Sequence, residues 1–159
     1  WTARGGAACL SYRLRFEPGF AFRRGGKLPG LFGGDAPTGC AAAEGRPGFS
    51  ARLMWREGGA GELYLYAPGR DSRCGESVAR GAWTFVPGRW TRVVQEARPE
   101  EGLLRLWIDG DQVAALARPL GGDGRLGLLL HAFFGGSGES WASPRDQWLE
   151  IDDVGLWVQ

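Results

Sequence analysis

The sequence predicts a single all-β domain, an antiparallel β-sandwich or barrel, and three observations support this prediction. The chain has 159 residues, a length typical of one domain, and 43% of them are hydrophobic, which is enough for a core. Apolar runs alternate as strands do, and no window of a dozen residues shows a helical stripe free of Gly and Pro. Glycine occurs 28 times, well above its usual share of about 7%, and falls between the apolar runs as turns do.

We expect about nine short strands separated by Gly- and Pro-containing turns. Alternation of apolar and polar residues is clearest in segments 10–16, 49–56 and 62–66. The other candidate strands are residues 82–86, 90–97, 103–109, 112–117, 126–134 and 148–158. Between two of these strands, Asp109-Gly110 is typical of a tight hairpin turn, because an Asp-Gly pair accepts positive φ angles.

The hairpin formed by residues 49–56 and 62–66 has two distinguishable faces. Matching opposite charges across the strands predicts the pairs Arg56 with Glu62, Met54 with Tyr64, and Arg52 with Tyr66. Because side chains alternate, the apolar face, expected in the core, comprises Ala51, Leu53, Trp55, Leu63 and Leu65. The other face comprises Ser50, Arg52, Met54, Arg56, Glu62, Tyr64 and Tyr66. That face is either an ordinary solvated surface or a polar, aromatic surface of the kind that binds sugars.

Three residues are single representatives of their type: Lys27, His131 and Met54, the last of which lies in candidate strand 49–56. Of 19 basic residues, 18 are Arg and one, Lys27, is Lys. It lies in the Gly-rich segment 23–34, which we interpret as a shaped loop whose spacing does not match a phosphate-binding loop. The one histidine, His131, falls in candidate strand 126–134 on the same side as Phe133, either as a hydrogen-bonded core residue or as part of a site.

The three cysteines indicate which compartment and which metal sites are compatible with the sequence. Cys40 and Cys74 lie in Gly-rich, loop-like segments and are expected to form a disulfide if the protein is secreted; Cys9 is expected to pack as a small apolar side chain. The alternative is three free thiols in a cytosolic protein. No CxxC pattern or Cys/His cluster is present, so we expect no zinc site and no required cofactor. The sequence has no dense acidic loop that would support a calcium site, and a need for calcium stays open.

Charge and hydropathy limit the partners. The formal net charge is +1, which leaves no electrostatic footprint for nucleic acid or an anionic membrane. No apolar run approaches the ~18 residues of a membrane span. We therefore expect neither nucleic acid nor a membrane as partner. The chain opens on Trp1 without an initiator methionine or signal sequence, and we expect a mature fragment or excised domain.

Four blocks of the sequence, in this order, resemble polysaccharide lyase family 14. They are Tyr12-Arg-Leu-Arg-Phe16, Gly25-Gly-Lys-Leu-Pro-Gly-Leu31, Phe49-Ser-Ala-Arg-Leu-Met-Trp-Arg56 and Tyr64-Leu-Tyr66. Further matches are Gly88-Arg-Trp90, Trp107-Ile-Asp-Gly110, Phe133-Phe-Gly-Gly136 and Trp141-Ala-Ser-Pro144. The family 20 glucuronan lyases look similar in architecture. Since the family normally has further strands before the Tyr12 strand, we expect residues 1–159 to form one lyase-like domain that lacks them.

The resemblance implies a jelly roll whose concave sheet forms the cleft for an acidic polysaccharide. It implies a secreted, monomeric lyase that cleaves alginate or β-1,4-glucuronan by β-elimination. The implied catalytic residues are Lys27, Arg52, Tyr64 and Tyr66, and the implied substrate-binding residues are Ser50, Gln95, His131 and Phe133.

The chemistry of these side chains suits elimination. Arg52 offers a planar fork for a uronate carboxylate, and Lys27 adds a compact charge whose pKa can fall far enough for proton transfer. Tyr64 or Tyr66 can act as base or acid if nearby cations lower the pKa of the phenol. Two other hypotheses stay open: a non-catalytic carbohydrate-binding jelly roll, and a structural or adhesion sandwich if these side chains lie far apart.

Overall fold

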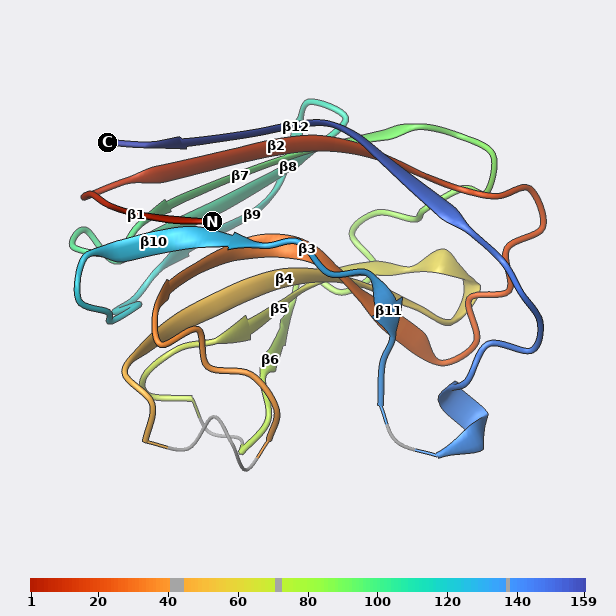
Figure 1. The fold of residues 1–159 in the computed structure, drawn as a ribbon, viewed down its shortest axis with the longest axis horizontal. Helices are drawn as coiled ribbons and strands as arrows, with labels where there is room; N and C mark the ends of the chain where they lie inside the picture. The colour runs from red at the N-terminus through yellow and green to blue at the C-terminus, as the bar shows by residue number, and fades with distance from the viewer. Residues whose placement is uncertain (41–44, 71–72, 137) are drawn as a thin grey trace.

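The computed structural model describes residues 1–40, 45–70, 73–136 and 138–159, and two antiparallel sheets packed face to face make up its fold (Figure 1). The seven-stranded sheet contains β1 (Thr2–Arg4), β10 (Arg125–Leu129), β3 (Gly25–Gly34), β4 (Gly48–Arg56), β5 (Gly61–Tyr66) and β6 (Glu76–Val78) in that order, with β11 (Phe133–Phe134) beside β3. The five-stranded sheet contains β12 (Leu149–Val158), β2 (Ala8–Phe16), β7 (Thr91–Arg98), β8 (Leu103–Ile108) and β9 (Asp111–Ala117) in that order. The predicted all-β sandwich of jelly-roll type is therefore confirmed.

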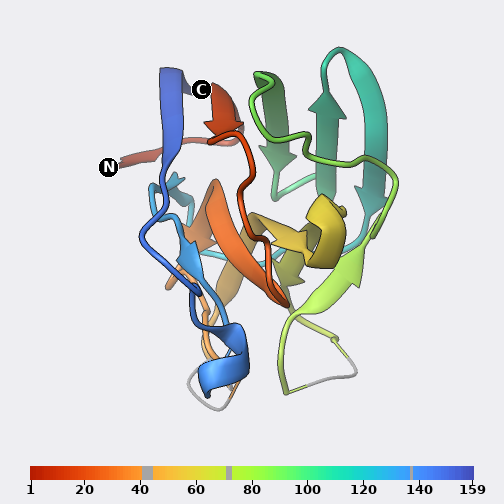
Figure 2. The ribbon, with the colours of Figure 1, turned by 90° about the vertical axis from the view of Figure 1, so that its right-hand side faces the viewer.

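The core lies between the two sheets and follows from alternation along each strand. In β2, Leu10, Tyr12 and Leu14 are fully buried, while Arg13 and Arg15, which alternate with the buried side chains, are half-buried on the outer face. The same holds for the predicted apolar face of the β4–β5 hairpin, all of whose members are buried in the core. Seen from the side, the two sheets form separate layers (Figure 2). The short 3-10 helix η2 (Glu139–Trp141) lies on the side of the seven-stranded sheet that faces away from the other sheet (Figure 2).

Strand β3 corrects our interpretation of residues 23–34 as a loop, because residues 25–34 form a strand. It is a ten-residue strand between β10 and β4, near the middle of its sheet. A Cβ on Gly26 would overlap the Trp55 ring, and a Cβ on Gly33 would meet the Phe49 ring. Glycine is thus required here because large side chains of β4 cover the strand. The prediction was wrong because glycine favours turns when its neighbours in space are unknown.

Other predicted boundaries also differ. Residues 82–86 form no strand and contribute only an isolated bridge between Ala60 and Thr84. The expected strand 126–134 divides into β10 and β11, with residues 130–132 outside both. Strands β1 and β6 were not expected. The turn at Asp109-Gly110 is confirmed, with φ angles of 52° and 99°.

The register of the β4–β5 hairpin is two residues away from the prediction. Its observed pairs are Met54 with Glu62, Arg52 with Tyr64, and Ser50 with Tyr66, and the 3-10 helix η1 (Glu57–Gly59) connects the strands. A two-residue shift keeps every side chain on its predicted face, because the side-chain period of a strand is two. The Arg56–Glu62 ion pair still forms, at 2.5 Å between Nη2 and Oε1.

The predicted disulfide between Cys40 and Cys74 is present. Cys9, which we expected to pack as a small apolar side chain, is a free thiol on the outer side of β2 and is partly exposed. Among the described residues, no helix has the length and apolarity needed to cross a membrane.

Candidate active site

The predicted catalytic residues lie in three adjacent cross-strand rows on the face of the seven-stranded sheet that points away from the core. The first row contains Phe133, Lys27, Met54 and Glu62 on β11, β3, β4 and β5. The second contains Gly30, Arg52 and Tyr64, and the third contains Phe32, Ser50 and Tyr66. Residues far apart in the sequence thus form one cluster, and the hypothesis of a scattered set is ruled out.

Lys27 occupies the centre of this cluster. Its Nζ lies 4.0 Å from the centroid of the Tyr64 ring, over the ring face, and 3.5 Å from Sδ of Met54. The side chain is half-buried, and burial together with the charges of Arg52 and Arg56 lowers the pKa of the Lys27 amine to about 7, against the opposing effect of Glu62. Near neutral pH the amine therefore exchanges readily between its charged and neutral forms.

Arg52 is a buried cation that retains only 5% of its surface exposed. Its guanidinium carbon lies 5.7 Å from the centroid of the Phe133 ring. Within the described ranges, no carboxylate lies in ion-pair distance of Arg52 or Lys27, whereas the fully buried Glu62 is engaged by Arg56. Two cations that form no ion pair with a described carboxylate leave the site prepared for an anion.

The two tyrosines pack edge to face, with ring centroids 5.5 Å apart. Tyr66 is buried, and Tyr64 is partly exposed. Burial, followed by the charge and hydrogen bond of Tyr66, raises the pKa of Tyr64, while Arg56 and a backbone hydrogen bond from Gly75 act in the opposite direction. The expectation that nearby cations lower the pKa of this phenol is therefore wrong for Tyr64, because desolvation has the larger effect.

Pro37 and Gly75, on the two segments that the disulfide joins, lie against one side of the cluster. Ser50 is fully buried, and its hydroxyl donates a hydrogen bond to the carbonyl of Pro37 at 2.5 Å. Gly75, next to Cys74, packs against both tyrosine rings so closely that a Cβ there would meet each of them. The segments on either side of the Cys40–Cys74 bond therefore hold the third row of the cluster in place.

Not every predicted substrate-binding residue belongs to this face. Phe133 does: its ring is 45% exposed and lies beside Lys27 in register. His131 is exposed outside the strands, between β10 and β11. The structure does not bring Gln95 to the cluster, since it is fully buried between the sheets with its carboxamide bonded to the backbone. Its position was available from alternation, because Val93, Gln95 and Ala97 share the inward side of β7.

Met54 is the residue that sequence reasoning passed over. It was placed on the right face without a role, yet it is buried and its sulfur contacts the Lys27 amine. The signal was its position two residues from Arg52 on a face that is otherwise polar.

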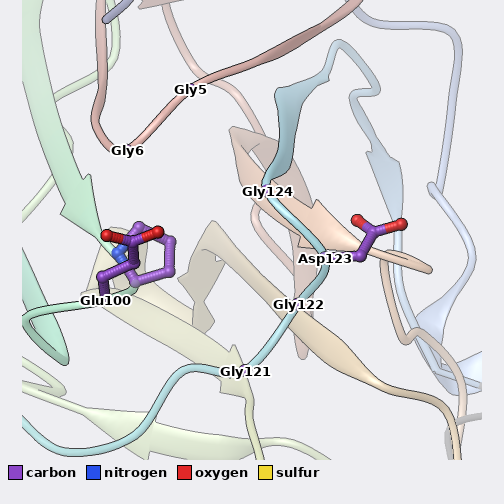
Figure 3. A pocket seen from close by; sticks show the side chains of 8 residues that line it. Gly5, Gly6, Glu100, Gly121, Gly122, Asp123 and Gly124 are labelled. Carbon is purple, nitrogen blue, oxygen red and sulfur yellow. The ribbon is translucent and has the colours of Figure 1, made fainter.

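The hollow shown in Figure 3 lies outside the cluster. It has a volume of about 350 Å³ and is lined mainly by glycine backbone, with the side chains of Glu100 and Asp123 on opposite sides of it. Asp123 is already paired with Arg125 at 2.7 Å. Over the part of the chain that the structure describes, no group of three or more His, Cys, Asp or Glu side chains gathers as a metal site would.

Together, the β-sandwich and the cluster of cations and tyrosines on one sheet define a polysaccharide lyase of the all-β class. The model of the family described as Polysaccharide lyase 14 matches residues 2–154, and the chain belongs to this family. Among curated proteins, no sequence matches the chain.

Solved structures agree with this assignment. The PL-14 alginate lyase from Aplysia kurodai is 27% identical, with a TM-score of 0.76 over 98% of this chain and 71% of that one. A variant of the alginate lyase Aly36B, with one lysine and one methionine replaced by alanine and an alginate trisaccharide bound, is 23% identical (TM-score 0.83, 97% and 71% coverage). The endo-β-1,4-glucuronan lyase from Trichoderma reesei, 16% identical (TM-score 0.62, 98% and 70% coverage), shares the fold.

Proposed function

We propose that this polysaccharide lyase cleaves a polyuronate by β-elimination, with alginate as the expected substrate and β-1,4-glucuronan as the alternative. The observation that carries the proposal is the pair of cations, Lys27 and Arg52, that face Tyr64 and Phe133 without a carboxylate partner among the described residues. A polyuronate brings one carboxylate on every sugar and would supply the counter-charge. The 27% identical relative is an alginate lyase, which favours alginate over glucuronan.

The first task of the enzyme is to make an unreactive proton acidic. Elimination removes the proton on carbon 5 of a uronate, forms the double bond between carbons 4 and 5, and breaks the bond from carbon 4 to the glycosidic oxygen. Negative charge grows on the neighbouring carboxylate during this step. We assign Arg52 to that carboxylate, because its planar fork matches it and because preorganised charge in a dry site stabilises the transition state most strongly.

We assign Lys27 as the general base. An amine takes the carbon-5 proton only in its neutral form, and a pKa of about 7 makes that form available near neutral pH. Arg52, whose guanidinium keeps its proton, then supplies the fixed positive charge while Lys27 moves between its two states. The division of work explains why one of the two cations is a lysine.

We assign Tyr64 as the general acid that protonates the departing oxygen. Its raised pKa keeps the phenol protonated over the pH range in which Lys27 is neutral. Tyr66, which is buried and hydrogen-bonded to Tyr64, orients that phenol and relays its proton. Ser50, held by Pro37 beneath the disulfide loop, would reach the substrate only through a rearrangement of that loop, so we assign it to shaping the site.

The solved relatives support the place of the substrate. The alginate lyase variant with an alginate trisaccharide lacks one lysine and one methionine side chain. In this chain the one lysine and the one methionine, Lys27 and Met54, contact each other at the centre of the cluster. We therefore propose that the uronate chain lies across Lys27 and Met54, with the exposed ring of Phe133 as a sugar-stacking surface and His131 at its margin.

We further propose that the enzyme acts outside the cell as a monomer and uses only its own side chains for the reaction. The Cys40–Cys74 bond supports an oxidising compartment. Acid, base and carboxylate recognition are all assigned to residues of the cluster, so the proposed steps need no cofactor, nucleic acid or membrane partner.

The test is an assay on alginate, its mannuronate-rich and guluronate-rich blocks, and glucuronan, followed by the ultraviolet absorbance of the unsaturated uronate ends. Growth of that absorbance on at least one polymer is expected. Retention of the protein by a polyuronate gel without product would instead indicate a binding module. Absence of both product and retention on every polymer would refute a polyuronate substrate.

A further inference from the structure

Lys27 reaches the site face only because β3 carries a bulge. Lys27 pairs with Met54 and Gly30 pairs with Arg52, so three steps along β3 match two steps along β4. Side chains of a regular strand alternate, and residues 27 and 30 would then point to opposite faces. The extra residue returns Lys27 to the face of Arg52 and Tyr64. Without it, the amine would point between the sheets, where Leu28 is fully buried.

The first group that holds this bulge is the hydroxyl of Tyr12. Tyr12 lies on β2 in the opposite sheet, only 1% exposed, and its hydroxyl donates a hydrogen bond to the carbonyl of Pro29 at 3.1 Å. Pro29 lies inside the bulge, has no backbone N–H to offer to a ladder, and its carbonyl falls where the register shifts. Tyr12 therefore satisfies a buried backbone acceptor that the bulge exposes.

The second group is the carboxamide of Gln95. Its Oε1 accepts a hydrogen bond from the N–H of Leu31 at 2.8 Å, and its Nε2 donates to the carbonyl of Ala51 at 2.9 Å. Leu31 and Ala51 are partners in the β3–β4 ladder, one step beyond the bulge. A side chain from β7 thus bridges the two strands at the point where their regular pairing resumes.

The hydrogen bonds of Tyr12 and Gln95 act on the same part of β3. Tyr12 and Gln95 lie on neighbouring strands, since Tyr12 pairs with Val93 and Leu10 pairs with Gln95. Both side chains are almost fully buried in a largely apolar core, where an unpaired polar atom is costly. Both cross that core to the same four-residue stretch of β3 that follows Lys27. Stability of the core alone does not require two buried polar side chains beside the bulge, so their position indicates a role in holding it.

We propose that Tyr12 and Gln95 are positioning residues that hold the β3 bulge and so fix the Lys27 amine beside Tyr64 and Met54. The consequence for catalysis rests on the proposed role of Lys27 as the base. The placement of Lys27 itself does not depend on that role and can be measured without substrate.

The experiment uses the full chain with 13C-labelled lysine, because Lys27 is the only lysine and gives a single side-chain resonance. Its Cε shift is followed from pH 5 to 11 in the wild type, Tyr12→Phe and Gln95→Met. The matched control is Thr91→Val, which also removes a buried polar group from β7, away from β3. Initial rates on alginate are measured at each pH in parallel.

In the wild type and in Thr91→Val, we expect the pKa of Lys27 at about 7. In Tyr12→Phe and Gln95→Met, we expect it to rise by one unit or more toward its ordinary value. On alginate, kcat at pH 7 then falls about fivefold for the first unit and about tenfold for each further unit, while KM changes little. The loss is recovered at a pH above the raised pKa, which a merely destabilised protein would not show.

A wild-type pKa near 10.5, or an unchanged pKa in the folded Tyr12→Phe variant, would overturn the inference. Tyr12→Phe keeps the aromatic ring, so if Gln95→Met fails to fold, the pKa of Lys27 in Tyr12→Phe is the test of the inference. If the wild type shows the expected titration but cleaves no polyuronate, the proposed function fails while the positioning of Lys27 stands.

Discussion

Replacing Lys27 with arginine removes the proposed base and keeps the positive charge, so it separates the two contributions of this side chain. Arginine keeps a positive charge at this position but does not lose its proton in proteins, so the variant can still attract a polyuronate and cannot act as a base. We expect Lys27→Arg to bind alginate with KM within a few-fold of the wild type and to lose most of kcat. The expected loss is about 100- to 10,000-fold, the usual contribution of general acid–base catalysis.

The structure also sets the pH at which the base works. With a pKa of about 7, half of the Lys27 side chains are neutral at pH 7. An unperturbed lysine, with a pKa of roughly 10.4, would be neutral in only about one molecule in 2,500 at that pH. The lowered pKa therefore increases the reactive form by roughly a thousandfold. Since the neutral form is the active one, the rate should rise with pH through about 7 and level off above it.

The assay is the initial rate of ultraviolet absorbance growth on alginate from pH 5 to 11, with Arg92→Lys as the control variant. Arg92 is exposed on the outer face of β7, away from the cluster, so this exchange of two cations should leave the profile unchanged. At the alkaline end the rate should fall only above pH 10, because the pKa of Tyr64 is raised. A Lys27→Arg variant with a rate near that of the wild type, or a wild-type profile without a rising limb near pH 7, would refute Lys27 as the base.

Three further substitutions test the surrounding structure. Arg52→Lys should lower kcat/KM about 10- to 150-fold through loss of the fork that binds the carboxylate, and an unchanged steady-state rate would remove Arg52 from substrate recognition. The double variant Cys40→Ser/Cys74→Ser should lose about 3–4 kcal/mol of unfolding free energy in urea, given a separation of 34 residues, and a loss below about 1 kcal/mol would contradict a constraining disulfide. Gly26→Ala should lower the melting temperature by several degrees, because its methyl group overlaps the Trp55 ring, and an unchanged melting temperature would contradict the close packing of β3 on β4.

The faces of the β4–β5 hairpin could be predicted from the sequence although its register could not. Alternation places Arg52, Tyr64 and Tyr66 on one side whichever partner each faces, provided that the register error is an even number of residues. The charge match of Arg56 with Glu62 suggested a directly opposite pair. In the structure the two side chains meet diagonally, because a long arginine reaches a neighbour one pair away.

The position of Lys27 could not be derived in the same way. Its face depends on a bulge, and the bulge depends on pairing with β4 and on two side chains from the other sheet. None of these partners is near Lys27 in the sequence. The resemblance to a known family supplied the residue, whereas local pattern indicated only a glycine-rich loop. For Gln95 the situation is reversed. Alternation along its strand correctly places the side chain inward, whereas the family resemblance implied a substrate-binding residue on the site face.

The Cys40–Cys74 bond has a consequence for how the site assembles. It closes a covalent ring that contains β4 and β5 and therefore Ser50, Arg52, Tyr64 and Tyr66. Contacts within such a ring have a short effective separation along the chain, so they form with a smaller loss of entropy than the sequence distance suggests. Lys27 is the one proposed catalytic residue outside the ring. In an oxidised chain, we therefore expect the proposed catalytic residues to come together when β3 pairs with β4, which the ring already holds beside β5.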